Sequence, residues 1–148
     1  LWSQKMQEQK ADMERATVGT GVAVSQTADN RLKLDIPSDV SFASGRADIS
    51  ASFAPILNQF ATSLNQNQVT SVSIIGHTDS TGSDAINNPL SVDRANAARD
   101  YLAMRGVARN RIMTEGRGPR EPIADNSNAQ TRAKNRRVEI YVAEPAQR

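Results

Sequence analysis

The sequence predicts an α/β sandwich in which helices pack on one face of a mixed β-sheet. Three observations indicate this fold class. Apolar residues alternate at 22–24 and again at 32–36, which is typical of a β-hairpin. A full helical stripe of apolar residues follows over 53–64. The rest of the chain alternates short β-branched runs with helical segments, an order that packs helices against a sheet.

The first seventeen residues are predicted to form a polar lead-in helix or tether. One stripe of this helix consists of Trp2, Met6, Gln9 and Met13. We expect the stripe to dock on the domain that follows, and contact with another subunit is the alternative. The chain is therefore divided into a lead-in (1–17), a folded domain (18–143) and a flexible tail (144–148).

The hairpin ends at Pro37, and we expect a loop from there to Ser50, before the first long helix. Ser50 or Ser52 can cap that helix, and Pro55 is tolerated only within its first turn. The buried stripe of the helix consists of Phe53, Ile56, Leu57, Phe60, Ala61 and Leu64. The run 69–75 is short, β-branched and apolar on both faces, as expected of a central strand.

The second long helix is predicted over 90–106. Asn88 and Pro89 suit the N-cap and the first helical position, and Gly106 suits a left-handed C-terminal cap. The segment 79–88 is rich in Gly, Ser, Asn and Asp, and we expect it to be a loop. The remaining segments are predicted as a strand over 112–115, a long loop over 116–127, a short helix over 128–135 and a strand over 138–142.

Composition fits a single domain and excludes several function classes. The chain has 148 residues with a formal charge of +2, and its basic and acidic residues are interleaved, which argues against nucleic-acid binding. It has no cysteine, so disulfides, thiolate metal sites and a cysteine nucleophile are excluded. No apolar run approaches the roughly 20 residues that span a bilayer. Because the chain begins at Leu1 without a methionine, we expect any signal peptide or lipid anchor to lie upstream.

Asp79 and Arg94 form the candidate site. Asp79 closes the motif Gly76-His77-Thr78-Asp79 at the end of the predicted central strand, and Arg94 lies in the first turn of the predicted helix. In a strand–loop–helix unit these two places lie side by side at one edge of the sheet. The pair can be a plain salt bridge, or a receptor for a zwitterion in which the acid takes an ammonium and the guanidinium takes a carboxylate. Arg94 also lies on the apolar side of its helix, where an unpaired charge is costly.

His77 is the only histidine, and we expect it to be structural, with its ring bridging backbone groups of the loop. A metal site would need further His, Cys or clustered carboxylates at ligand spacing. A catalytic base would need a nucleophile held in place, and adjacency to Ser80 is not a triad geometry. The glycines at 116–118 lack the following helix and lysine of a phosphate loop, so no cofactor is expected. Arg136 and Arg137 enter the last strand and so point to opposite faces, which lets one of them face the site.

Several motifs occur together in a fixed order. They are GHTDSTG (76–82), Asn87-x-x-Leu90-Ser91-x-x-Arg94-Ala95, Gly106-Val107, Arg111-Ile112, Gly116-x-Gly118, Pro122-Ile123-Ala124 and NRRVEI (135–140). Read together they resemble the OmpA-like C-terminal domain, a family that includes the peptidoglycan-associated lipoprotein and the wall-anchoring parts of flagellar stator proteins. The resemblance covers roughly residues 38 to 143. The hairpin and the polar helix before it resemble the lead-in of outer-membrane lipoproteins of this family that carry a glycine-rich segment upstream.

The resemblance implies an OmpA-like βαβαβ core and non-covalent binding of peptidoglycan through the meso-diaminopimelate of its stem peptide. That residue carries an ammonium and a carboxylate on one carbon. By matching positions, Asp79 resembles the family's ammonium acceptor and Arg94 its carboxylate fork. The residues that resemble the lining of the same groove are Asn87, Thr81, Arg136 and Leu90. Pro89 and Pro119 depart from the polar residues usual at their positions and stiffen loops beside the site.

The leading hypothesis is therefore a wall-binding module without catalysis. The resemblance implies a place in the periplasm of a Gram-negative bacterium, with an anchor to the outer membrane upstream of this chain. One rival is an enzyme, such as a hydrolase that uses His77 with Asp79. Another is an envelope assembly module driven by the Trp2/Met6/Met13 stripe, and the oligomeric state stays open.

Overall fold

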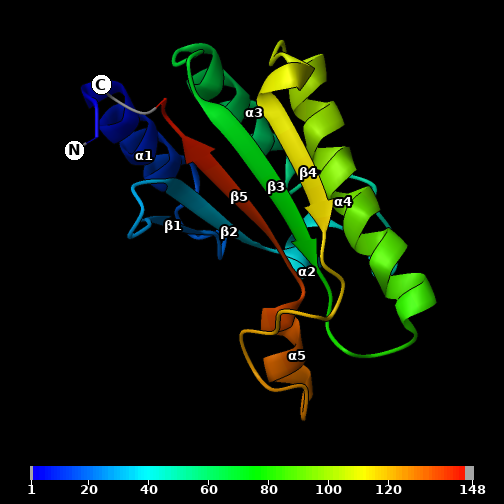
Figure 1. The fold of residues 1–148 in the computed structure, drawn as a ribbon. Helices are drawn as coiled ribbons and strands as arrows, with labels where there is room; N and C mark the ends of the chain where they lie inside the picture. Colours follow the sequence, from blue (N-terminus) through cyan, green and yellow to red (C-terminus); the bar gives the residue numbers. More distant parts are fainter. Residues whose placement is uncertain (1, 146–148) are drawn as a thin grey trace.

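The structure is a computed structural model, and it describes residues 2–145 (Figure 1). Leu1 and residues 146–148 of the predicted tail lie outside the described residues. The elements in chain order are α1 (Gln4–Ala16), β1 (Ala23–Gln26), β2 (Leu32–Pro37), α2 (Ser38–Ser41), α3 (Ala54–Asn65), β3 (Ser71–His77), α4 (Asp84–Met104), the 3-10 turn η1 (Arg109–Arg111), β4 (Ile112–Gly116), α5 (Ala129–Asn135) and β5 (Arg137–Ala143).

The strands form one mixed five-stranded sheet in the order β1-β2-β5-β3-β4. β3 and β4 are parallel, and the other neighbouring pairs are antiparallel. Pro37 of β2 and His77 of β3 both pair with Arg137, the first residue of β5. The carboxyl ends of β2 and β3 therefore meet the start of β5 at one edge of the sheet. Gly116, the last residue of β4, pairs with Gly76 and so reaches the same edge.

Helices cover one face of this sheet, as the sequence predicts. In Figure 1, α1, α3 and α4 lie behind the strands. Alternate strand residues point toward these helices and are fully buried, because successive side chains of a strand leave opposite faces. The inward-pointing strand residues of the core are Leu32, Leu34, Ile36, Val72, Ile74, Val138, Ile140 and Val142. The opposite face carries polar side chains, including Lys33, Glu139 and Tyr141, and the predicted fold class is confirmed.

The lead-in helix α1 packs on α3 and completes the core. Met6 and Met13 are 0% exposed, and Gln9 donates a 3.1 Å hydrogen bond to the buried hydroxyl of Ser63 in α3. Trp2 is also nearly buried, and its Nε1 donates to the carbonyl of Asn30 at 2.6 Å. The stripe is thus packed against the domain within the chain, as expected from the sequence, and is not exposed for the alternative, contact with another subunit.

The helix predicted over 90–106 begins earlier than expected. α4 starts at Asp84 after the N-cap Ser83, so Pro89 lies inside it rather than at its first position. Proline has no N–H, and the carbonyl of Ala85 accordingly receives no helical bond from Pro89. Arg94 lies in the third turn, not the first. Gly106 ends the helix with φ 95°, the left-handed cap that the sequence predicts.

Two glycines let α4 rest directly on the sheet. A Cβ added to Gly76 in β3 would lie 2.1 Å from the carbonyl oxygen of Ser91, and one added to Gly116 in β4 would lie 2.4 Å from the amide nitrogen of Val92. Only glycine permits such an approach of helix backbone to strand. This contact fixes the part of α4 that precedes Arg94 over the carboxyl ends of β3 and β4. Within residues 2–145, no helix is both long and apolar enough to cross a membrane.

Candidate functional site

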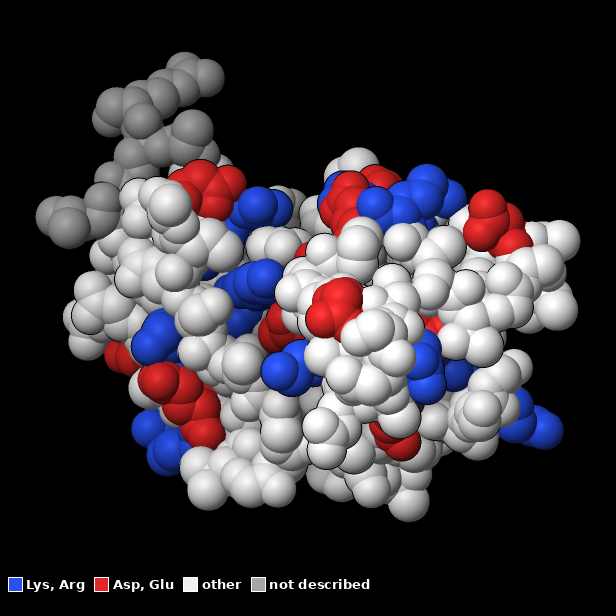
Figure 2. Space-filling view, turned by 90° about the horizontal axis from the view of Figure 1, so that it is seen from below, with Lys and Arg blue, Asp and Glu red and all other residues white. Residues whose placement is uncertain are grey.

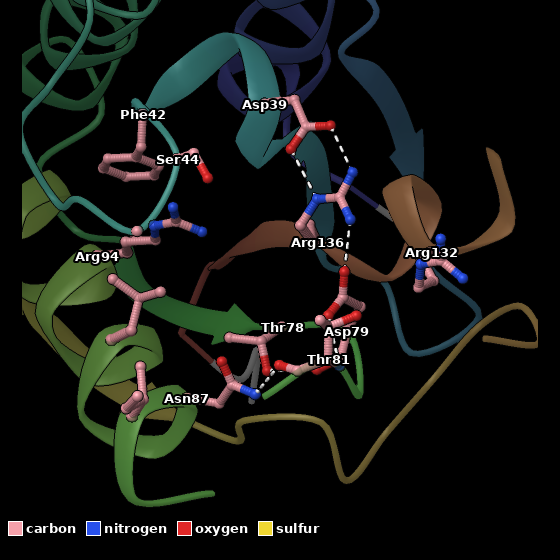
Figure 3. Close-up of a pocket in the computed structure, with 13 residues that line it drawn as sticks. Asp39, Phe42, Ser44, Thr78, Asp79, Thr81, Asn87, Arg94, Arg132 and Arg136 are labelled. Atoms are coloured by element: carbon pink, nitrogen blue, oxygen red, sulfur yellow. Dashed lines mark hydrogen bonds and ion pairs between the residues drawn. The ribbon is translucent and has the colours of Figure 1, made fainter. Parts of the chain in front are cut away.

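A cavity of about 650 Å³ lies at the edge of the sheet where β2, β3 and β4 end and β5 begins. Every side chain that the sequence singles out as ligand-binding lines this cavity. These residues are Asp79, Arg94, Asn87, Thr81, Arg136 and Leu90. The structure thus brings the six residues together, and their role in binding a ligand stays a prediction. Figure 3 shows the cavity with its lining side chains.

Asp79 follows β3 and is 7% exposed. Its Oδ1 accepts the backbone N–H of Thr81 at 2.8 Å, so the carboxylate organises the loop that leads to α4. Its Oδ2 lies 2.5 Å from Nη1 of Arg136. A carboxylate offers about four acceptor positions, so two of them stay open for another donor.

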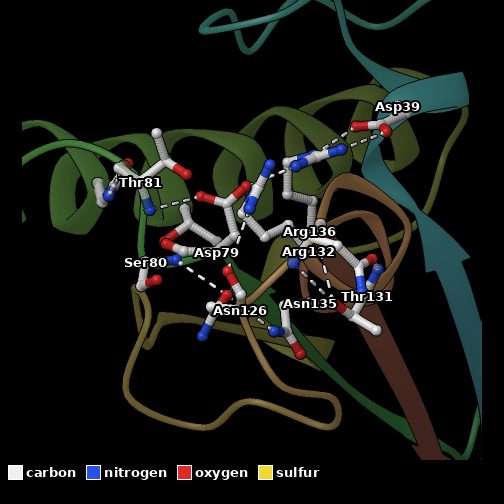
Figure 4. A network of polar contacts seen from close by, with 12 residues as sticks. Asp39, Asp79, Ser80, Thr81, Asn126, Thr131, Arg132, Asn135 and Arg136 are labelled. Carbon is white, nitrogen blue, oxygen red and sulfur yellow. Dashed lines mark hydrogen bonds and ion pairs between the residues drawn. The ribbon is translucent and has the colours of Figure 1, made fainter.

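Arg136, just before β5, bridges two carboxylates. Besides Asp79 it contacts Asp39 in α2, with Nε and Nη2 each 2.8 Å from a carboxylate oxygen (Figures 3 and 4). The hydrogen bond from Arg136 holds the pKa of Asp39 below its usual range, and the same bonds raise the pKa of the Arg136 guanidinium. Such two-point contacts fix the orientation of the guanidinium plane.

Arg94 does not form the salt bridge with Asp79 that one interpretation of the sequence expects. Among the residues described, Asp79 pairs with Arg136 instead. Arg94 is 4% exposed, and its Nε donates to the carbonyl of Arg46 at 2.8 Å while Nη2 donates to that of Ala43 at 3.3 Å. Its guanidinium carbon lies 5.0 Å from the ring centroid of Phe42. Burial lowers the pKa of this guanidinium.

The loop between α2 and α3 therefore supplies the partners of Arg94. Sequence reasoning expected only a loop between Pro37 and Ser50, but α2 forms directly after β2. Asp39 in α2 and Phe42 after it both line the cavity. In the sequence, the available signal for this region was Pro37, the proline that ends the strand. It could not show that β2 pairs with β5, which is the pairing that brings Asp39 to Arg136.

Asn87 fastens the Asp79 loop to the first turn of α4. Its Nδ2 donates to the carbonyl of Thr81 at 2.8 Å, and the residue is 7% exposed. Leu90, one turn later, presents a partly buried apolar side chain to the cavity, as does the mostly exposed Ile86. The wall formed by α4 thus presents these apolar side chains together with the charged side chain of Arg94.

Asn135 holds a second loop against the site. It is fully buried, and its Oδ1 accepts the N–H groups of Ile123 and Ala124 at 2.8 and 3.0 Å. Its Nδ2 donates to Asn126 at 3.0 Å, and Asn126 in turn accepts the N–H of Ser80 at 3.3 Å (Figure 4). The loop after β4 is thereby tied to the loop that carries Asp79.

His77 does not belong to this cavity. Its side chain is 1% exposed, and Nε2 lies 3.4 Å from Oε1 of Glu139 without the alignment of a hydrogen bond. The prediction that the His77 ring bridges backbone groups of the loop is therefore wrong. Arg137 pairs with Glu139 at 2.8 Å on the same face, whereas Arg136 points into the cavity, so the two arginines diverge as predicted. Burial alone would raise the pKa of Glu139, but its contacts with His77 and Arg137 outweigh burial and lower it.

Charge at this end of the molecule is mixed. Figure 2 views the end that carries α5, and basic and acidic side chains are interspersed over it. Among residues 2–145 no group of three or more His, Cys, Asp or Glu is placed to hold a metal ion. The arrangement suits recognition of a small molecule with charges of both signs.

The cavity lies at the carboxyl ends of the strands and is lined by both Asp79 and Arg94. The segment of the chain that carries these residues also matches a known family model. Residues 41–136 match the model of the OmpA family, and the chain belongs to that family. The matched residues include all six cavity residues predicted from the sequence, with Arg136 as the last residue of the match, whereas the cavity residue Asp39 precedes the match.

Among curated relatives, the chain is similar to the probable lipoprotein YiaD of Escherichia coli. The two are 42% identical over 138 residues, which cover 93% of this chain and 63% of that protein. It is 46% identical over 103 residues to the peptidoglycan-binding protein ArfA of Mycobacterium tuberculosis, covering 70% of this chain and 32% of that protein. The chain thus spans less than two thirds of the length of these two relatives.

Solved structures share the fold. The cell wall anchor of the type VI secretion system (T6SS) from Pseudomonas aeruginosa is 35% identical, with a TM-score of 0.77, and the match covers 95% of this chain and 97% of that one. The peptidoglycan-associated lipoprotein from Burkholderia pseudomallei is 25% identical with a TM-score of 0.63, covering 69% of this chain and 85% of that one. Both relatives are named for an association with the cell wall or its peptidoglycan.

Proposed function

We propose that this domain binds peptidoglycan non-covalently through the meso-diaminopimelate of the stem peptide. One observation carries the proposal: Asp79 and Arg94 line the same cavity without pairing with each other. A buried acid and a buried base that are held apart by other partners leave room for a ligand with both charges. The distal end of diaminopimelate is such a ligand, because its ammonium and carboxylate share one carbon.

Asp79 is assigned to the ammonium. Thr81 and Arg136 use one acceptor position on each carboxylate oxygen, and an ammonium can take the positions that stay open. Because Arg136 is itself shared with Asp39, it neutralises Asp79 only in part. The carboxylate therefore keeps an attraction for a further cation.

Arg94 is assigned to the carboxylate. Of the five N–H groups of a guanidinium, two bind loop carbonyls, and three remain for the ligand. The carbonyls and the Phe42 ring hold the plane of the group fixed before the ligand arrives. Leu90 and Ile86 would contact the methylene chain of diaminopimelate.

The relatives support this assignment in outline. ArfA is named as a peptidoglycan-binding protein and the Pseudomonas structure as a cell wall anchor. We extend the same role to this chain, and we place it in the periplasm with attachment to the outer membrane through a segment upstream of this chain. The name of YiaD as a probable lipoprotein supports such an attachment.

The two rivals fit the structure less well. A hydrolase built on His77 with Asp79 would need both groups in the cavity, and His77 lies at the other face of the sheet beside Glu139. An assembly module driven by the Trp2/Met6/Met13 stripe would need that stripe exposed, and the stripe is buried against the domain. We therefore propose binding without catalysis.

The proposal is tested by pull-down on purified sacculi with Asp79→Asn. This change keeps the shape of the side chain and removes its charge, and loss of one partner of a desolvated charge pair commonly costs about 2–5 kcal/mol, enough to abolish weak binding. Asp93→Asn is the matched control, because Asp93 is exposed on α4 and lies outside the cavity. Retention of binding by a folded Asp79→Asn protein would overturn the site assignment.

A further inference from the structure

The cavity holds more positive than negative charge. Three arginines line it (Arg94, Arg132 and Arg136), against two carboxylates (Asp39 and Asp79). A zwitterion is neutral and leaves this surplus unchanged. Since a half-buried charge without a counter-charge is unfavourable, the surplus indicates a ligand that brings a second anionic group.

If the carboxylate of the zwitterion is assigned to Arg94, then Arg132 is the cavity arginine that is left without a counter-charge. Its Nη1 donates to the carbonyl of Asn126 at 3.1 Å, and no carboxylate among the described residues lies within ion-pair distance of it. Arg136, by contrast, bridges two carboxylates. Arg132 lies in the last turn of α5 and Arg136 directly follows that helix, and both side chains line the cavity. It is not among the residues that the sequence singled out.

The three arginines are spread along the cavity. In Figure 3, Arg94 and Arg132 lie at opposite ends and Arg136 lies between them. The volume of about 650 Å³ is in the usual range for small-molecule sites, about 300–1,000 Å³, and the end of one amino-acid side chain fills only a part of it. A zwitterion held between Asp79 and Arg94 would therefore leave the Arg132 end for the rest of the ligand.

We infer that Arg132 forms a second anion subsite, which takes a carboxylate of the stem peptide outside the diaminopimelate zwitterion. The inference rests on the proposed function and extends its ligand from one residue to a peptide segment. Two carboxylates qualify chemically. One is the α-carboxylate of the γ-linked glutamate that precedes diaminopimelate, and the other is the carboxylate at the end of the peptide.

Calorimetry with synthetic stem peptides tests the subsite. All peptides keep the distal ammonium and carboxylate of diaminopimelate, and they carry an amide at the glutamate, at the chain end, at both or at neither. We expect wild type to bind one of the two singly amidated peptides about tenfold more weakly than the acid peptide, the usual scale for losing one charge-assisted bond. Which amide weakens binding identifies the carboxylate.

Two variants make the test specific. Arg132→Gln should bind the acid peptide about tenfold more weakly and should no longer distinguish it from the amide. Lys134→Gln is the control, because Lys134 is an exposed cation of the same helix outside the cavity, and it should behave as wild type.

Two outcomes would overturn the inference. Wild type that binds all four peptides equally has no second subsite. Equal weakening of all four peptides by Arg132→Gln would mean that Arg132 acts through the Asn126 loop and not on the ligand. The doubly amidated peptide keeps the two failures apart: if wild type binds it and Asp79→Asn does not, the proposed function stands without the subsite. Wild type that binds none of the peptides would overturn both.

Discussion

Replacement of Arg94 by lysine separates the geometry of the guanidinium from its charge. Arg94 makes a 2.8 Å bond to the carbonyl of Arg46 and a longer one, 3.3 Å, to that of Ala43. A bond to a charged group is worth about 1.5–3 kcal/mol. Lysine can replace one of these bonds but not both while it also faces the ligand. We expect Arg94→Lys to destabilise the unliganded domain by about 1–2 kcal/mol.

The effect on binding should be larger than the effect on folding. Three N–H groups of Arg94 are available to a ligand carboxylate and permit a planar two-point contact, whereas an ammonium is a point charge. Loss of one charge-assisted bond weakens binding by about 1.5–3 kcal/mol, which corresponds to a factor of roughly ten to a hundred and fifty. The variant keeps its formal charge, so long-range attraction for the ligand does not change.

Calorimetry with a diaminopimelate-containing peptide and chemical denaturation of the unliganded domain measure the two effects. Arg109→Lys is the control, since Arg109 is exposed and lies outside the cavity. An Arg94→Lys protein that is folded and binds within twofold of wild type would refute the argument that the guanidinium fork matters.

Three further predictions concern the frame of the site. Asp39→Asn leaves Arg136 to neutralise Asp79 alone, and calorimetry should show about two- to fivefold weaker peptide binding, a modest loss because Asp39 is half exposed. Unchanged affinity would show that the Asp39 contact is incidental. The pKa of Asp39 is lower in the folded domain than in the unfolded chain. The ionised carboxylate of Asp39 therefore stabilises the fold fully above the unfolded pKa, and this contribution is lost as the pH falls through the folded pKa. The free energies of unfolding of wild type and Asp39→Asn should therefore differ by a constant amount from about pH 5 to 8 and converge as the pH falls below about 4. A difference that grows in acid would contradict the lowered pKa of Asp39. Gly76→Ala places a Cβ against the Ser91 carbonyl and should destabilise the domain by about 1–3 kcal/mol or more in urea, whereas a neutral result would mean that α4 can shift away.

The elements with strong periodicity could be predicted from the sequence. The hairpin, the stripe of α3 and the last strand depend on local alternation, and the structure contains all of them. The start of α4 could not be predicted in the same way. The polar segment before Pro89 has the composition of a loop, and a proline is usual at the first helical turn. Contacts with residues outside the segment, such as the hydrogen bond that Arg120 donates to Asn88, stabilise the extra turns.

The sequence predicted where the site lies but not which residues contact each other within it. The end of a strand and the following helix bring Asp79 and Arg94 to one cavity, as expected. Their partners come from segments that lie far away in the sequence. Arg136 reaches Asp79 across 57 residues, and the carbonyl of Arg46 reaches Arg94 across 48. Such contacts depend on the strand order, which periodicity alone does not define.

Titration of the domain with three stem peptides tests the central claim most directly. One peptide carries diaminopimelate, one carries lysine in its place, and one carries diaminopimelate with its distal carboxylate amidated. All three keep the ammonium for Asp79, but only the first offers a carboxylate to Arg94, so the other two should bind at least about tenfold more weakly. Equal affinities for the three peptides would contradict the claim that Asp79 and Arg94 together form a zwitterion receptor.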